Sequence, residues 1–378
     1  MKGDIVSAVF SAHPNLRGLG LVGWHFDGVG VSGFHNLRQF TLRAEDDDGD
    51  ADMSEVRAVL DQNQETLAHL TLGAYLMRHH SWDDAFRSAT IQKLTHLDLV
   101  DTRISHYVLT RIAHAQNLKS LTLHGTFERP SAASVIFASD HEVGGQHTFL
   151  PHLHSFRFIM VGHDDEVALF QSVVSFLRAR TQLRRLDLGE CPWELVKNLL
   201  PTLTGLRVLR ARIPKLNEQS AQDFAGALPT TMLAIHLSVV MSDRSMVCSG
   251  VTSSDQPNLP FSLKHNYSSV FSRFQSLSML HLAATSVRRP QSNTDRDFYA
   301  WSLQAKRVAL TLPTLDFLGW HGEHYVIVRD ENKGVDLKEL PARKRLDSGK
   351  GVDLGTEDAG WLERKDVPID FERSELED

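Results

Sequence analysis

An apolar triplet with the spacing Leu-x-x-Leu-x-Leu recurs along the chain. Six copies contain leucine at all three positions, and they begin at Leu16, Leu67, Leu94, Leu118, Leu183 and Leu277. Leucine accounts for 50 of 378 residues, a frequency that predicts roughly one such match by chance, so the repeat is real. Looser copies, in which other apolar residues replace leucine, begin at Leu37, Leu153, Leu206, Met232 and Leu315. The starts recur at a mean spacing of about 30 residues, just above the usual length of a leucine-rich repeat.

The alternation within each triplet predicts a strand whose leucines face the core and whose intervening residues face outward. Apolar residues at helical spacing follow several triplets, and they predict helices over 53–67, 104–118, 164–180, 217–228 and 268–277. No single repeat can bury its own apolar face, so neighbouring repeats must stack. We therefore predict an α/β leucine-rich-repeat solenoid over residues 1–328, with about eleven repeats, a parallel sheet on its concave face and helices on its convex face. A short apolar run from Ile5 to Ala12 predicts an N-terminal helix.

The last segment, residues 329–378, has a different composition. It contains 15 acidic and 10 basic residues and little apolar material. We expect a charged C-terminal tail that is partly ordered or disordered, with Trp361 and Phe371 as anchors where it wraps the end of the solenoid.

Composition excludes several classes of protein. The net charge of −7 argues against binding nucleic acid through a general basic field. The two cysteines give no disulfide framework, and no stretch approaches the roughly 20 apolar residues of a membrane span. We expect a cytoplasmic or nuclear protein that binds neither nucleic acid nor membrane.

The outward positions of the strands supply the candidate contact residues. The middle repeats place Arg157, Arg185, Asp187, Arg210 and Arg212 on the concave face. Adjacent strands lie about 4.8 Å apart, so we expect the four guanidinium groups to form one patch. Arginine is suited to bind carboxylate or phosphate. Two interpretations stay open: docking of an acidic or phosphorylated protein, or a solvated face with ion pairs to Asp187.

Earlier repeats place His96, Asp98 and His124 on the same face, beside His69. Histidines on neighbouring strands can bind metal or respond to pH, but in a chain with 20 histidines an ordinary polar surface explains them more simply. We include His96, Asp98 and His124 among the partner-contact residues and expect no metal. Met279, Phe317 and His321 in the last repeats form an apolar edge that either contacts a partner or packs under the tail.

No arrangement of residues indicates catalysis. Cys191 has no base partner in the sequence and occupies a structural repeat position. We expect no enzyme activity and no cofactor.

The repeats resemble the ribonuclease-inhibitor-like class, and the repeat region of fungal F-box/leucine-rich-repeat proteins in particular. The residues that carry this resemblance are the strand starts Asn15-Leu16, Asn36-Leu37, Asn117-Leu118 and Gln182-Leu183, and the segments 315–322 and 361–368. The resemblance implies substrate recognition in an F-box-type (SCF) ubiquitin ligase. The first triplet begins at Leu16, which leaves no room before it for an F-box, so we expect a Skp1-like scaffold as partner only if an F-box is supplied.

The sequence therefore predicts a protein-binding leucine-rich-repeat module. The alternative is a bare repeat regulator, either an inhibitor or a GTPase-activator-like scaffold, with no connection to ubiquitin.

Overall fold

The computed structural model describes residues 2–22, 30–43, 53–73, 82–83, 85–86, 91–143, 146–162, 166–242, 270–284, 296–320, 323–330, 334–339 and 357–362. They belong to two compact units, which we treat separately. The first unit takes the described residues of Met1–Leu183, and the second takes those of Arg184–Arg364.

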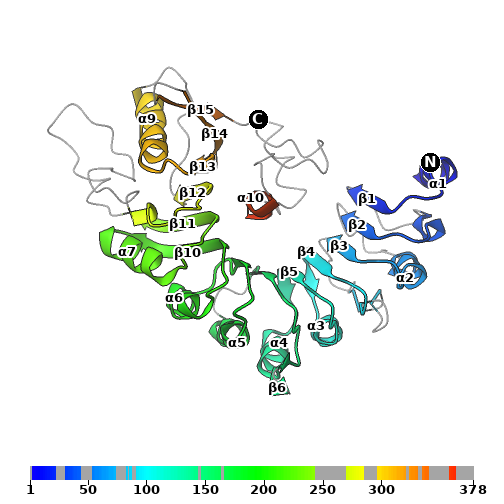
Figure 1. The fold of residues 1–378 in the computed structure, drawn as a ribbon. Coiled ribbons are helices and arrows are strands. Elements are labelled where there is room, and N and C mark those ends of the chain that lie inside the picture. The colour runs from blue at the N-terminus through cyan, green and yellow to red at the C-terminus, as the bar shows by residue number, and fades with distance from the viewer. Residues whose placement is uncertain are drawn as a thin grey trace. The chain divides into compact units, whose positions relative to one another are not determined.

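The first unit is a series of parallel strands. In chain order, and each paired with the next, they are β1 (Gly18–Val22), β2 (Gln39–Arg43), β3 (His69–Gly73), β4 (His96–Ile104), β5 (Ser120–Phe127) and β8 (Ser155–Met160). Helix α1 (Lys2–Ala12) precedes β1, and α5 (Val167–Arg178) follows β8. Between the strands lie α2 (Met53–Gln62), α3 (His106–Ala113) and α4 (Pro130–Ala138). Helices α2 to α5 cover one side of these strands (Figure 1). A 3₁₀ turn (Val31–Gly33) and the hairpin of β6 (Glu142–Val143) and β7 (Gln146–His147) complete the unit.

The second unit repeats the arrangement and ends differently. Its parallel strands are β9 (Arg185–Asp187), β10 (Val208–Leu216), β11 (Ala234–Ser242), β12 (Met279–Ala284) and β13 (Phe317–Trp320). Strands β14 (Glu323–Arg329) and β15 (Val335–Glu339) then add in antiparallel order. The helices are α6 (Trp193–Leu199), α7 (Glu218–Ala227), α9 (Arg296–Thr311) and α10 (Glu357–Leu362), with a 3₁₀ turn at Leu200–Thr202. Strand β15 is polar and partly exposed, as suits the edge of a sheet.

The predicted repeat is confirmed at every triplet. Each of the eleven parallel strands begins two residues after the first apolar residue of its triplet, as at Leu94 and His96 or at Leu315 and Phe317. The triplet leucines after the first repeat are buried; Leu97 and Leu99, for example, are both 0% exposed. In the first triplet Leu21 is buried, while Leu16 and Leu19 are half-buried. The fold is therefore an α/β leucine-rich repeat.

The predicted helices are shorter than the patterns that indicated them. Four of them form as α2, α3, α5 and α7, and the run from Ile5 lies in α1. In the segment 268–277, only residues 270 and 271 are helical among those described, and a turn follows. Helices α4, α6, α9 and α10 were not predicted. Helix α4 begins with Pro130 and is apolar without a clear stripe, and α6 spans only seven residues.

One backbone carbonyl accepts two N–H groups at the start of nine of the parallel strands. In the first unit, the carbonyl of Ala68 accepts the N–H groups of both Thr95 and His96, at 2.9 and 3.0 Å. The carbonyl of Thr95 does the same for the next repeat, and in the second unit the carbonyl of Leu233 accepts from Ser278 and Met279. The register is thus the same whether a repeat has 24 residues or 45.

The parallel pairing of β4 with β5 is interrupted at Asp101. The register moves from Leu99↔Leu123 to Thr102↔Gly125, so β4 contains a bulge. Asp101 has a φ of 50°, a left-handed conformation that aspartate tolerates better than most residues. The carbonyl of Thr102 approaches Gly125 so closely that a Cβ on Gly125 would lie 1.8 Å from its oxygen.

We predict that Gly125→Ala lowers the free energy of unfolding by about 2–4 kcal/mol, because backbone must move to admit the new methyl group. Urea denaturation followed by circular dichroism measures the change. Gly33→Ala is the matched control, since a Cβ on Gly33 meets no atom within 4 Å. Equal stability of the two variants would contradict the bulge geometry.

Candidate functional site

The strand face of the second unit carries an apolar row with a cation at one end. Strand pairing aligns Arg185, Val208, Ala234, Met279 and Phe317 as direct neighbours. These positions alternate with the buried leucines, so they lie on the side of the sheet opposite helices α6 and α7. We call Val208, Ala234, Met279 and Phe317 the apolar row, and Arg185 lies at its end.

Helix α10 packs on the apolar row. Leu362 is 0% exposed and forms one cluster with Val208, Ala234 and Met279, against which Phe317 and Trp361 also pack. The helix lies across the strands from α6 and α7 (Figure 1). Of the two open interpretations for Met279 and Phe317, packing under the tail is therefore the observed one, and Trp361 is an anchor as predicted. His321 and Phe371 lie outside the described residues.

Two carboxylates of α10 pair with the arginine that ends the row. Arg185 Nε donates to Asp358 Oδ1 at 2.6 Å, and Arg185 Nη2 donates to Glu357 Oε1 at 2.9 Å. The Arg185 side chain is 18% exposed, Asp358 is 26% exposed and Glu357 is 84% exposed. The bond to Asp358 is therefore the better shielded of the two, and such charge-assisted bonds are stronger than neutral ones.

In the second unit, Arg185, Arg210 and Arg212 each have a carboxylate partner in the chain. The pair of Arg210 with Asp187 is the kind of ion pair that the second of the two interpretations predicted. Arg210 Nη1 lies 3.8 Å from Asp187 Oδ2, and Arg212 pairs with Glu190. Both side chains keep about a third of their surface exposed.

Two predicted contact residues are corrected. Asp187 is 0% exposed and Arg157, in the first unit, is 1% exposed, so neither offers surface to a partner as the structure stands. Asp187 accepts the N–H of Gly189 at 3.0 Å and faces Arg210. Around Arg157 the outward residues Ser120, Thr122 and Ser155 are buried too. Strand alternation predicts the side that a residue faces but not what lies on that side.

The histidines of the first unit form contacts between strands. The rings of His69 and His96 stack with centroids 4.1 Å apart, and His96 Nδ1 lies 2.9 Å from the hydroxyl of Thr95. Asp98 accepts a hydrogen bond from Thr71 at 3.3 Å. His69 is exposed, and both His96 and Asp98 are half-buried, so this part of the strand face is polar and accessible.

His124 belongs to an ion-pair cluster that the sequence did not predict. Its Nδ1 lies 3.5 Å from Asp101 Oδ1, while Arg43 Nη2 donates to Asp101 Oδ2 at 2.6 Å. Asp101 reaches both because of the bulge in β4, and nothing in the triplet pattern indicates a bulge. Its one signal in the sequence is an aspartate directly after the apolar run.

A second unpredicted feature is a row of buried histidines in the second unit. The ring of His281 lies 4.1 Å from that of His236 and 5.1 Å from that of His324. Gly319 makes room for it, since a Cβ there would lie 2.2 Å from His281 Cγ. Within the described residues no three His, Cys, Asp or Glu side chains are grouped so as to hold a metal ion.

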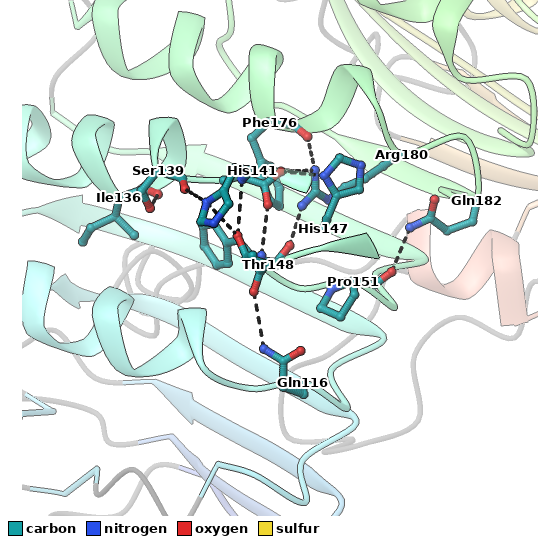
Figure 2. A network of polar contacts seen from close by, with 12 residues as sticks. Gln116, Ile136, Ser139, His141, His147, Thr148, Pro151, Phe176, Arg180 and Gln182 are labelled. Atoms are coloured by element: carbon teal, nitrogen blue, oxygen red, sulfur yellow. Dashed lines mark hydrogen bonds and ion pairs between the residues drawn. The ribbon is translucent and has the colours of Figure 1, made fainter. Parts of the chain in front are cut away.

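A polar network in the first unit ties the β6–β7 hairpin to α5 (Figure 2). The guanidinium of Arg180 is 0% exposed; it donates to Asp140 Oδ2 at 3.1 Å and to the carbonyls of Phe149 and Phe176. Asp140 also pairs with His147 Nδ1 at 3.0 Å and accepts the N–H of Phe149 at 3.0 Å. Burial lowers the pKa of Arg180, and the bond to Asp140 opposes that shift. Since every contact joins chain segments to one another, the network is structural.

We predict that Arg180→Ala lowers the free energy of unfolding by about 3–5 kcal/mol, because it leaves the buried Asp140 charge without its cation. Arg178→Ala, an exposed position at the end of α5 and two residues before Arg180, should change it by less than about 1 kcal/mol. Guanidinium denaturation of both variants tests this, and a similar loss in both would argue against the network.

Cys191 is 4% exposed, and burial raises the pKa of its thiol to about 12. A thiol in this state is a poor nucleophile. None of the helices in the described ranges is long and apolar enough to span a membrane.

Comparison with known proteins adds little to this geometry. No protein-family model matches the sequence, and no curated protein does. Among solved structures, the chain is similar to a leucine-rich-repeat protein of Leptospira interrogans, with 14% identity, a TM-score of 0.23 and coverage of 83% of this chain and 86% of that one. A likeness this distant carries no argument about function. The repeat fold follows instead from the strand register and the helices between the strands.

Proposed function

We propose that the chain is a protein-binding repeat module whose strand face receives a segment of another protein. One observation carries the proposal: the strand face of the second unit already holds a helical segment, α10, through the ion pairs of Arg185 and the burial of Leu362. A surface that binds a helix of its own chain has the depth, apolar area and charge to bind one from elsewhere.

Each unit has further candidate contact residues of its own, which are polar and partly exposed. In the second unit these are Arg210 and Arg212, which are partly exposed despite their carboxylate partners. In the first unit they are His96, Asp98 and His124, all half-buried. Partners that offer carboxylate or phosphate groups fit the arginines best.

Two contexts for this binding remain. The first is substrate recognition in an F-box-type ubiquitin ligase, which rests on the sequence resemblance and requires a Skp1-like scaffold. The second is a bare regulatory scaffold, which binds its target without one. Association with a Skp1-like scaffold distinguishes them.

The proposal is tested by affinity purification of the full chain from its own cells, with quantitative mass spectrometry. We predict that Arg210→Gln combined with Arg212→Gln reduces recovery of a specific partner by about tenfold, the effect of losing one or two charge-assisted contacts. The unmodified chain also shows whether a Skp1-like scaffold is recovered with it.

Lys197→Gln on helix α6 is the matched control. Lys197 is 38% exposed and pairs with Asp223 at 2.8 Å, so it resembles Arg210 in exposure and in having a carboxylate partner, but lies on a helix. Loss of the partner in the Lys197 variant, with retention in the arginine variant, would place binding on the helix side and overturn the proposal.

A further inference from the structure

We infer that the α10 site is the recognition site for a partner helix with an aspartate and a leucine four residues apart, and that α10 holds this site as a built-in competitor. This inference rests on the proposed function and names the partner's chemistry. The site consists of Arg185 and the apolar row Val208, Ala234, Met279 and Phe317.

The two halves of the site match the two halves of α10. Asp358 and Leu362 are separated by four residues, so they share one face of the helix. Asp358 meets Arg185 at 2.6 Å, and Leu362 is buried on Val208, Ala234 and Met279. A ligand therefore needs a carboxylate and a branched aliphatic side chain at this spacing, with an aromatic residue beside the leucine as at Trp361.

Glu357 contributes less than its neighbour. Its side chain is 84% exposed, and ion pairs open to solvent are weak. Asp358 and Leu362 are thus the determinants that a partner must reproduce, and Glu357 supplies an internal control.

Helix α10 is too short to be stable without the sheet. It spans six residues, whereas isolated helices of fewer than about 12 residues are marginal in water. Its helical state therefore depends on the contacts with β10 and β11. A segment held in this way exchanges with a competing helix, because its own propensity contributes little to holding it in place.

Gly360 marks α10 as a weak helix. It is exposed, and a Cβ there meets no atom within 4 Å. Alanine would fit and would favour the helix by about fivefold, the equivalent of about 1 kcal/mol per glycine replaced. The native sequence thus keeps the competitor below the affinity that the site allows.

The test measures fluorescence anisotropy of a labelled peptide spanning residues 352–364 added to the full chain. Leu362→Asp in the full chain expels its own α10, because it would bury a carboxylate in the apolar row. We expect the peptide to bind this variant about tenfold or more tightly than the unmodified chain, since competition in cis is removed. Asp358→Ala in the peptide should weaken binding about tenfold, and Glu357→Ala by less than about threefold.

Substitution of Gly360 should change the affinity of the peptide in the opposite direction. In the peptide, Gly360→Ala should tighten binding about fivefold; in the full chain, the same substitution should weaken binding of the native peptide by a similar factor. Because the peptide variants leave the protein untouched, the results obtained with them do not depend on how any variant chain folds.

Equal binding of the native peptide to the unmodified and Leu362→Asp chains, or indifference to Asp358→Ala, would overturn the inference. So would formation of a dimer by exchange of α10, which light scattering detects, because the occupant would then be a second copy of this chain. If the peptide does not bind but the cellular partner is still lost on changing Arg210 and Arg212, the inference fails and the proposed function stands.

Discussion

Shared backbone carbonyls mark where nine of the parallel strands of this protein begin. One carbonyl before each of these strands accepts two N–H groups from the following repeat, as Arg38 does for Ala68 and His69, and Arg207 for Leu233 and Ala234. The triplet leucines alone would tolerate sliding by two residues, because they would still face the core. A carbonyl that accepts two N–H groups fixes one register and so prevents this sliding. The strands therefore stay in register although the segments between them differ greatly in length.

Register in turn creates the candidate site. A contact surface requires that outward residues from successive repeats stand side by side, and the alignment of Val208, Ala234 and Met279 is what gives Leu362 a continuous apolar floor. The same alignment places Arg185 at the end of that floor, where it meets Asp358, which lies one helical turn before Leu362 in α10. The chemistry of the site thus comes from single residues contributed by separate repeats.

The strands of the repeat could be predicted from the sequence, but the contacts that the side chains on the strand face make could not. Each strand was predictable because its triplet is a local pattern, and outward residues such as Arg185 and Met279 follow from alternation. The pairing of Arg185 with Asp358 joins residues 173 positions apart, and no local pattern encodes it. Burial of Arg157 and Asp187 was missed for the same reason. Asp101 reaches His124 only through a bulge, and the ring of His281 fits only because position 319 has no side chain.

Disulfide formation between engineered cysteines tests the register most directly. Gln39 and His69 are aligned partners on parallel strands, so their Cα atoms lie about 4.8 Å apart, within the range that a disulfide spans. With Cys191 and Cys248 changed to serine, Gln39→Cys with His69→Cys should oxidise readily, as read by mass spectrometry of a non-reduced digest. Gln39→Cys with Thr71→Cys should not, because a shift of two residues separates the Cα atoms by about 8 Å. Preferential formation of the second disulfide would contradict the strand register of the repeat.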